Sequence, residues 1–305
     1  MLDEIRTFVT LAEAGSLQRA AERLLLTPSA VTRQIQRLET ALGAPVLDRR
    51  VKPPRITPIG QSVLEQGRSL LRSFEAMKAS ASTKTEPAGV FRLGLSHGLA
   101  VAAIAAPIRQ MTNRFSSLQP QLNADMTQNL LERVRRGDLD AAVMLLPAGE
   151  PHSPDLIGKV IATDHMTIVG PAGLLRGQEG DLRCLDGQGW VLNPPGCLVR
   201  ETFRSTLEAA GMPLKVAAEV HNMDLQLSLV SAGYGLGLFP GRFLAQRREL
   251  DSLATAGNFG LDIPVSIAFV KAGSLGRLEP AAIALHEELC GYFSRSGVTA
   301  TRTQA

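Results

Sequence analysis

The chain has 305 residues, of which 45% are hydrophobic and 20% are charged. This length is enough for two or three compact units with buried cores. The net charge of +3 at pH 7 permits contact with nucleic acid without establishing it. No apolar run approaches the roughly 20 residues that span a bilayer, and the opening segment MLDEIRTF lacks the apolar core of a secretory signal. We therefore expect a cytoplasmic protein with no membrane partner.

The cysteines and histidines show no metal-ligand spacing. Cys184, Cys197 and Cys290 lie far apart in the sequence, which fits free thiols in a reducing compartment. The sequence also contains no phosphate-binding glycine loop and no Gly-x-Ser-x-Gly elbow. We expect no metal, no cofactor and no enzymatic activity.

The first 57 residues predict two short helices joined by a tight turn, after an initial helix over residues 3–14. Ser16 is a good N-cap for a helix over residues 17–24. Thr27 caps the next helix, and Pro28 suits its first position. The initial helix is expected to pack beneath this pair through an apolar stripe of Ile5, Phe8, Val9 and Ala12.

The second helix of the pair predicts a DNA-reading element. One face is apolar and contains Val31, Ile35, Leu38 and Leu42. The other faces carry side chains that can bond base edges and phosphates, and a basic, proline-rich wing with Lys52 follows Gly43. The alternative is an ordinary solvated face, but the short turn, the lack of acids before Glu39 and the adjacent wing favour DNA. The predicted DNA contacts are Ser29, Thr32, Arg33, Gln34, Arg37, Arg49, Arg50 and Arg55.

This stretch resembles the DNA-binding domain of LysR-type transcriptional regulators. The matching residues are Phe8, Ala12, 16–24, 29–35, Leu38-Glu39, Leu42-Gly43 and 57–60. The resemblance implies a winged helix-turn-helix over residues 1–58 and a bacterial transcription regulator that binds double-stranded DNA at an imperfect palindrome. It also implies a homodimer, assembled into a homotetramer, and RNA polymerase as a partner.

Residues 59–82 predict one long helix that joins two chains. Its apolar positions alternate by fours and threes, close to the spacing of a helix–helix seam, and they are Ile59, Val63, Gly67, Leu70, Phe74, Met77 and Ala81. The alternative is a helix lying on its own domain. We favour a dimerising linker helix because no second local helix is evident to cover the seam, and the resemblance implies the same. The small, polar residues 83–89 predict a hinge.

The rest of the chain alternates strands and helices, which predicts an α/β fold with a largely parallel sheet. Strands are expected near 90–96, 121–126, 139–146, 165–170, 190–192, 216–220 and 263–270. Helices are expected near 99–115, 128–136, 198–210, 223–232 and 278–293. The glycines of 233–240 follow a helix and precede a strand, the reverse of a dinucleotide-binding motif.

The resemblance implies that residues 90–296 form a two-lobe, periplasmic-binding-protein-like (type 2) sensor domain. Lobe 1 would comprise about 90–162 and 266–296, and lobe 2 about 163–265, with crossover strands between them. Residues 297–305 are expected to be a tail.

A small-molecule effector is expected where strand ends and helix starts meet in this domain. The candidate residues are Ser96, His97, Gly98, Thr127, Gln128, Asn129, Gly196, Cys197, Asn222 and Met223. For each, the alternative is a structural role, above all helix capping by Ser96, Thr127 and Asn222. Because all these residues are expected to face one cleft, binding is favoured for some of them. A small polar or anionic effector is expected because helix N-termini attract anions.

Two competing functions fit the sequence less well. An enzyme would need a nucleophile with a paired base, and none has recognisable spacing. A solute-binding protein would have no use for residues 1–60. The position of Cys197 at a helix start would also suit a redox sensor, but no other cysteine lies near it in the sequence, which disfavours that role.

Overall fold

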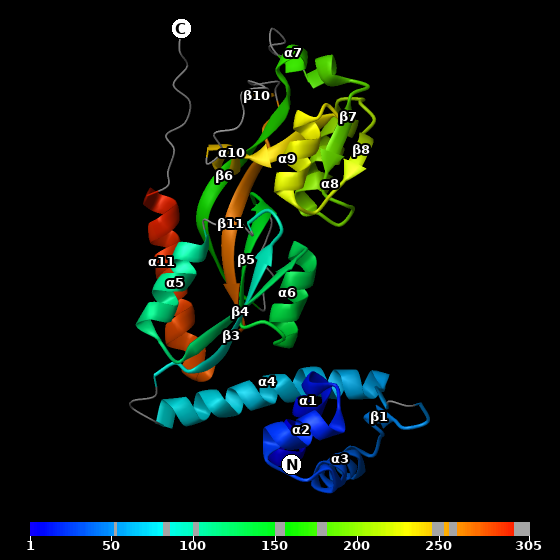
Figure 1. Ribbon diagram of the computed structural model, residues 1–305, viewed down its shortest axis with the longest axis vertical. Helices are drawn as coiled ribbons and strands as arrows, with labels where there is room; N and C mark the ends of the chain where they lie inside the picture. Colours follow the sequence, from blue (N-terminus) through cyan, green and yellow to red (C-terminus); the bar gives the residue numbers. More distant parts are fainter. Residues whose placement is uncertain are drawn as a thin grey trace. The chain divides into compact units, whose positions relative to one another are not determined.

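The computed structural model of the chain describes residues 1–51, 54–81, 86–99, 104–149, 156–175, 182–245, 253–255 and 261–295. They form two compact units (Figure 1). The first comprises residues 1–87 with the short segments 136–138 and 274–279, and the second comprises the remainder. Lys52, residues 83–85 of the predicted hinge and the tail at 297–305 lie outside the described residues. Within the described part, no helix is long and apolar enough to cross a membrane.

The first unit begins with three helices whose ends follow the predicted local signals. They are α1 (Leu2–Ala14), α2 (Leu17–Leu24) and α3 (Pro28–Leu42). The Ser16 hydroxyl accepts a hydrogen bond from the Arg19 N–H at 3.2 Å, and Thr27 does the same for Ala30 at 3.2 Å. Gly43 ends α3 in the left-handed region, with φ of 67°, which a glycine adopts without strain.

A small core joins these helices to a two-stranded wing. The wing pairs β1 (Leu47–Asp48) with β2 (Arg55–Ile56) in antiparallel register. The core contains Phe8, Val9, Ile35, Leu38, Val46 and Leu64, and the predicted stripe on α1 is confirmed by the burial of Phe8 and Val9. Leu42, which we expected on the apolar face of α3, is 43% exposed instead, because α3 extends past the core at its last turn.

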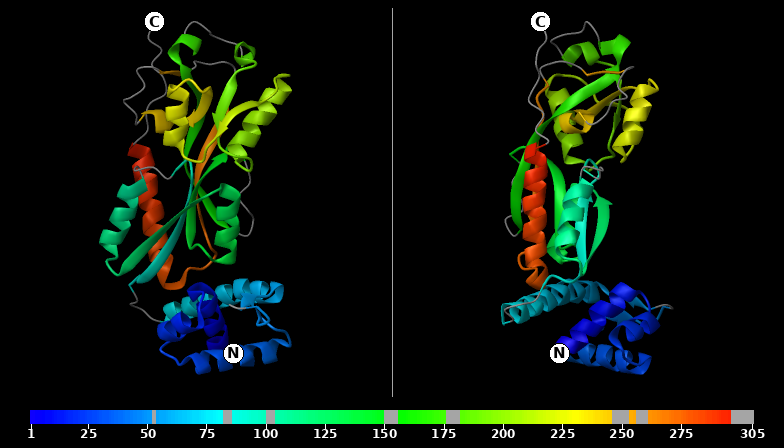
Figure 2. Two further views of the ribbon diagram at one scale, coloured as in Figure 1. Left: turned by 45° about the vertical axis from the view of Figure 1, so that its right-hand side comes forward. Right: turned by 60° about the vertical axis from the view of Figure 1, so that its left-hand side comes forward.

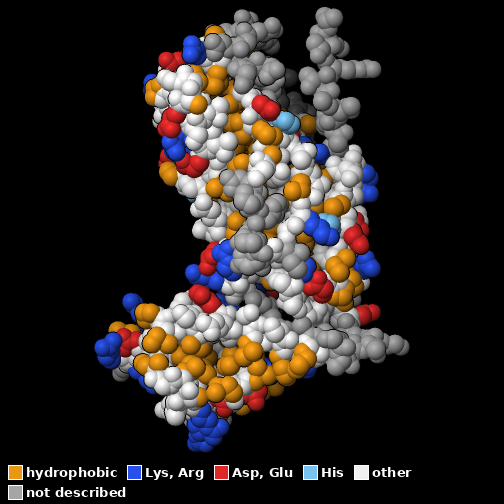
Figure 3. Space-filling model, turned by 180° about the vertical axis from the view of Figure 1, so that it is seen from behind, with side chains coloured by type: hydrophobic (Ala, Val, Ile, Leu, Met, Phe, Trp, Pro, Cys, Tyr) orange, Lys and Arg blue, Asp and Glu red, His pale blue; other side chains and the backbone are white. Residues whose placement is uncertain are grey.

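The long helix α4 (Pro58–Ala81) divides the predicted seam between two faces. Gly67 packs on α1, where an added Cβ would come within 2.9 Å of the Ile5 side chain. A second local helix therefore does cover part of the seam, contrary to the expectation that none would. Ile59 and Leu70 are about half exposed, at 51% and 49%, and Figure 3 shows hydrophobic side chains gathered on one face of the first unit, to which α4 belongs.

The second unit is built, in its described residues, on a nine-stranded sheet in the order β4-β3-β5-β11-β6-β9-β7-β8, with β10 also paired to β6. Its strands are β3 (Gly89–Ser96), β4 (Leu118–Asp125), β5 (Ala141–Pro147), β6 (Ile157–Pro171), β7 (Gly189–Leu192), β8 (Lys215–Glu219), β9 (Leu236–Pro240), β10 (Leu253–Thr255) and β11 (Pro264–Lys271). The pairs of β3 and β7 are parallel, but β11 and β6 pair antiparallel with their neighbours. The sheet is therefore mixed, and the expectation of a largely parallel sheet was wrong for the strands that join its two halves.

The strand β6 is the longest and differs most from its predicted range of 165–170. Residues 157–165 pair with β11, and residues 166–169 pair with β9 (Figure 2). Its first half was not predicted because Lys159, Thr163 and Asp164 interrupt the apolar run that marks a buried strand. One strand thus belongs to both halves of the sheet.

Helices cover both faces of the sheet. The unit contains α5 (Ala105–Arg114), α6 (Thr127–Arg136), α7 (Ala172–Leu175), α8 (Leu198–Ala209), α9 (Met223–Ser231), α10 (Gly241–Ala245) and α11 (Glu279–Arg295), with short 3-10 turns at Leu182–Leu185 and Gly276–Leu278. In the half that contains β3, α5 and α11 lie on one face and α6 on the other (Figures 1 and 2). Strand ends and helix starts meet where the two halves join.

Gly60 provides a test of the packing in the first unit. A Cβ at this position would meet the Val46 carbonyl oxygen well inside van der Waals contact and lie 2.9 Å from an Ile56 methyl group. Because a backbone atom cannot move aside as a side-chain tip can, Gly60→Ala is expected to lower the free energy of unfolding by about 1–3 kcal/mol. Urea denaturation followed by circular dichroism measures this. Gly173→Ala, where nothing lies within 4 Å of the added atom, is the control, and equal stability of the two variants would contradict the packing.

Candidate functional site

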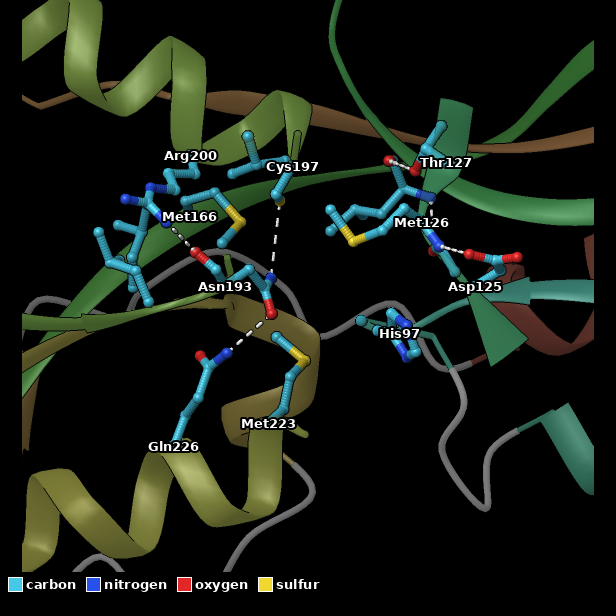
Figure 4. Close-up of a pocket in the computed structure, with 16 residues that line it drawn as sticks. His97, Asp125, Met126, Thr127, Met166, Asn193, Cys197, Arg200, Met223 and Gln226 are labelled. Atoms are coloured by element: carbon cyan, nitrogen blue, oxygen red, sulfur yellow. Dashed lines mark hydrogen bonds between the residues drawn. The ribbon is translucent and has the colours of Figure 1, made fainter. Parts of the chain in front are cut away.

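A pocket in the second unit lies where the ends of β3, β4 and β7 meet the starts of α6, α8 and α9 (Figure 4). Both halves of the sheet contribute to its wall. Six of the ten residues predicted from the sequence line it, and they are Ser96, His97, Gly98, Thr127, Cys197 and Met223.

The other four predicted residues do not line the pocket, and they are Gln128, Asn129, Gly196 and Asn222. Asn129 donates from its amide to Asp125 at 2.8 Å. Asn222 caps α9 by accepting the Leu225 N–H at 2.9 Å, which is the structural alternative considered for it. Gly196 is exposed and has φ of 90°, so it serves the turn into α8.

Ser96 and Thr127 hold one backbone unit between them. The Ser96 hydroxyl oxygen accepts the Leu145 N–H at 3.0 Å, and the Thr127 hydroxyl donates to the Leu145 carbonyl at 3.3 Å. Both side chains are buried, and neither caps a helix through these bonds. Since the Ser96 oxygen is an acceptor here, its own O–H is left to donate to a molecule in the pocket.

Two charged residues on the wall were not predicted from the sequence, and each is balanced within the fold. Arg200 donates to the Asn193 carbonyl at 2.8 Å and pairs with Glu219 at 2.8 Å. Asp125 lies 3.5 Å from Arg133. Burial alone would raise the pKa of Asp125, but hydrogen bonds from Asn129 and a backbone N–H, with Arg133 nearby, lower it. The pocket therefore offers no unbalanced strong charge among its described residues.

A chain of amide hydrogen bonds links α9 to the start of α8. Gln226, which is buried, donates to the Asn193 side-chain oxygen at 2.8 Å, and Asn193 donates to the Cys197 sulfur at 3.6 Å. Cys197 is the N-cap of α8 but makes no side-chain cap, so the first N–H groups of α8 remain available to a ligand. Asn193 directly follows β7. The expectation that effector-binding residues lie at strand ends, which selected Ser96, therefore applies to Asn193 as well. Gln226 lies one helical turn after Met223, on the same face of α9.

His97 lies at the pocket wall beside His221, with 4.7 Å between the ring centroids. Burial and the neighbouring His221 lower the pKa of His97, although Asp125 opposes the shift. His97 is therefore expected to be neutral at pH 7. Across the described residues, no three His, Cys, Asp or Glu side chains are grouped to hold a metal.

The first unit presents a cationic surface around α3. The side chains of Arg33, Arg37 and Arg55 are exposed and form no hydrogen bond or salt bridge with any described residue. Ser29 is also exposed, and its hydroxyl is hydrogen-bonded to that of Thr27 at 3.0 Å. The Thr32 hydroxyl donates to the Pro28 carbonyl at 2.9 Å. The three guanidinium groups are therefore accessible from solvent on this surface.

Three more of the predicted DNA contacts, beyond Ser29 and Thr32, have side chains that are already bonded within the first unit. The oxygen of Gln34 accepts a hydrogen bond from Thr7 of α1, which turns Gln34 toward the neighbouring helix. Arg49 pairs at 2.8 Å with Glu39, which also accepts the Val46 N–H at 3.0 Å.

The third engaged residue, Arg50, pairs with Asp48 at 2.9 Å. Hydrogen bonds from Arg50 lower the pKa of Asp48 to about 2. Arg49 and Arg50 therefore each carry a charge that is already paired within the first unit.

Comparisons with known proteins match both units. The family model described as "Bacterial regulatory helix-turn-helix protein, lysR family" matches residues 2–61, and the model "LysR substrate binding domain" matches residues 84–287. The transcriptional dual regulator GltC of Bacillus subtilis is 26% identical over 304 residues, which cover 96% of this chain and 98% of GltC. The regulator TfdS of Cupriavidus pinatubonensis is 27% identical over 277 residues, which cover 88% and 91%.

Solved structures share the fold at lower identity. A full-length OxyR variant from Pseudomonas aeruginosa has a TM-score of 0.77 at 21% identity and covers 95% of this chain and 94% of its own. Full-length CbnR in complex with its target DNA has a TM-score of 0.60 at 21% identity and covers 97% and 100%. The helix-turn-helix, the mixed two-lobe sheet and both family matches lead to one conclusion: the chain belongs to the LysR family and is a DNA-binding transcription regulator with an effector-binding domain.

Proposed function

We propose that this regulator binds an imperfect palindromic operator as a homodimer, assembled into a tetramer, and that a small polar or singly charged anionic effector in the pocket controls it. The observation that carries the proposal is the pocket itself, whose wall combines residues from both halves of one sheet. An effector that binds one arrangement of the halves more tightly shifts the population toward it. RNA polymerase is the proposed partner at the promoter.

The pocket supports binding better than catalysis. The Cys197 thiol lies on the pocket wall, and its sulfur accepts a hydrogen bond from the Asn193 amide. An amide cannot take up the thiol proton as a general base does. We therefore propose that the chain has no enzymatic activity, and turnover of a ligand bound in this pocket would contradict that.

We propose that Ser29, Thr32 and Arg33 face the major groove and that Arg37 and Arg55 contact phosphates. All five residues lie on or beside α3. The guanidinium groups of the three arginines also form no ion pair with the described residues. Arg49 and Arg50 are secondary phosphate contacts, because DNA must compete with Glu39 and Asp48 for them.

Arg33→Ala is expected to weaken operator binding by about 1–3 kcal/mol and to relax sequence preference, as loss of a bidentate base contact does. Gel-shift titrations on the operator and on unrelated DNA measure both effects. Arg204→Ala, in a surface ion-pair network of the second unit, is the matched control. If Arg33→Ala kept the affinity and preference of the control, α3 would not read bases through Arg33.

We further propose that α4 joins two chains through the exposed face around Ile59 and Leu70, together with Val63, Phe74 and Met77. Leu70→Asp is expected to break the dimer, because pairing would bury a carboxylate without a partner. Since Leu70 is half exposed in the single chain, the fold itself should tolerate the change.

Sedimentation measures the assembly of the Leu70→Asp variant. Gln61→Asp is the control, because Gln61 is exposed and helical periodicity places it on the opposite side of α4 from Leu70. The control should remain a dimer. An intact Leu70→Asp dimer with normal operator binding would exclude this interface.

The proposed effector site comprises Ser96, His97, Gly98, Thr127, Cys197 and Met223, with Asn193, Arg200 and Gln226 added from the structure. Ser96→Ala removes one donor and is expected to reduce effector affinity by about 0.5–1.5 kcal/mol. Calorimetric titration with the effector measures this, and operator affinity without effector should not change. Asn222→Ala, which removes a cap of α9 outside the pocket wall, should leave effector affinity unaltered. Equal effector affinity in wild type and Ser96→Ala would place the effector elsewhere.

A further inference from the structure

A second cavity lies within the half of the sheet that contains β3. Its volume is about 340 Å³, compared with about 50 Å³ for the pocket between the two halves, and it falls in the range of small-molecule sites, about 300–1,000 Å³. One wall is α11 and the other is formed by β6 and β11, which lie beside it in Figures 1 and 2. We call it the α11 cavity, and its described lining shares no residue with that of the pocket.

The strand register gives the α11 cavity an apolar floor with a cationic edge. Phe269 of β11 is paired directly with Lys159 of β6, so their side chains stand together on one face of the sheet. Lys271, two residues after Phe269, points to the same face. Phe269 is 4% exposed, and its ring lies 5.5 Å from that of His286 on α11. The two lysines therefore lie beside an aromatic surface.

The helix wall leaves space above this floor. Ala282 is buried where α11 faces the sheet, and its single methyl group reaches less far toward the strands than any larger apolar side chain. Ile283, beside it on the lining, is 49% exposed. A ligand that covered Ile283 and Phe269 would remove apolar surface from water, which is favourable. The α11 cavity therefore suits a ligand with an apolar body.

The charges of the lining favour one negative group on that ligand. Lys159 is exposed and forms no hydrogen bond or ion pair with the residues that the structure describes. The Lys271 ammonium group is held at the strand end by the carbonyls of Ala272 and Gly273, at 3.4 and 3.2 Å. Lys159 is thus the cation that can turn to a ligand.

The single carboxylate of the described lining is shared with a cation outside it. Glu287 lies 3.9 Å from Arg114 of α5. Burial and the Lys159 cation lower the pKa of His286, and Glu287 opposes this shift. The imidazole therefore adds no positive charge at pH 7. With two lysines against one carboxylate, the α11 cavity has a surplus of one positive charge.

We propose that the α11 cavity binds a small monocarboxylate with an apolar body. Its carboxylate pairs with Lys159, and its body lies between Phe269 and Ile283. A second negative group on the ligand would be repelled by Glu287, which limits the ligand to one. The site is separate from the pocket between the two halves and does not depend on the role proposed for that pocket.

The test uses hexanoate with two matched probes. Hexanamide keeps the chain and loses the charge, and acetate keeps the charge and loses the chain. Ligand-observed NMR titrations on the full-length protein give the dissociation constants. We expect hexanoate to bind about three- to tenfold more tightly than hexanamide, because an exposed lysine gives a modest charge-assisted bond. Acetate should bind more weakly than hexanoate, and added salt should reduce the ratio of hexanoate to hexanamide affinity.

Two variants place the ligand in the α11 cavity. Lys159→Gln should bring the ratio of hexanoate to hexanamide affinity close to one, and the exposure of Lys159 makes the fold tolerant of this change. Ile283→Ser should weaken both probes alike. Lys215→Gln is the control, because Lys215 is also an exposed strand lysine but lies outside both linings. It should leave the ratio unchanged.

Several results would overturn the proposal. They are no binding of hexanoate, equal binding of hexanoate and hexanamide, and an unchanged ratio in Lys159→Gln. Equal affinity for acetate and hexanoate would exclude the apolar body. Ser96→Ala reports on the other pocket: weaker hexanoate binding in this variant, with normal binding in Lys159→Gln, would place hexanoate between the two halves and not in the α11 cavity.

Discussion

The second unit depends on the backbone hydrogen bonds of β6, which belong to both halves of the sheet. Residues 157–165 pair with β11 and residues 166–169 pair with β9. The two halves therefore cannot separate without breaking strand pairing. A small change in the twist of β6 would tilt one half against the other and leave each core intact. The pocket draws its wall from both halves, so such a tilt would change the distances across it.

The arginines of the chain fall into two groups according to whether a carboxylate lies beside them. Arginines that hold the fold together lie beside carboxylates in both units, as Arg49 does beside Glu39 and Arg200 beside Glu219. Arg33, Arg37 and Arg55 form no such ion pair with the described residues. An exposed arginine without an ion pair costs the fold little, and it retains its full charge for a phosphate.

The sequence predicted the local elements well because their signals are local. Ser16, Thr27 and Gly43 act within one helical turn, and each marks the boundary that the structure shows. The antiparallel strands β6 and β11 were not predicted as such, because strand direction depends on pairing between residues about a hundred positions apart. Within the pocket, strand-end reasoning found Ser96 and Thr127. The same reasoning missed Arg200 and Gln226, because the direction of their side chains depends on the rotation of their helices. It also assigned Asn222 to the site, although the Asn222 side chain caps α9.

The close contact at Gly67 has a consequence for how a signal can reach DNA. Since α4 lies against α1 with no room for even a methyl group between Gly67 and Ile5, α4 cannot rotate about its own axis without displacing the whole helix-turn-helix. The helix-turn-helix and α4 therefore share one packed core. In the dimer proposed above, an effector would alter the separation and angle between two such packed heads and would leave the reading surface of each unchanged. The base preference within each proposed half-site would then be constant, and the effector would change the bend and spacing of the DNA between half-sites.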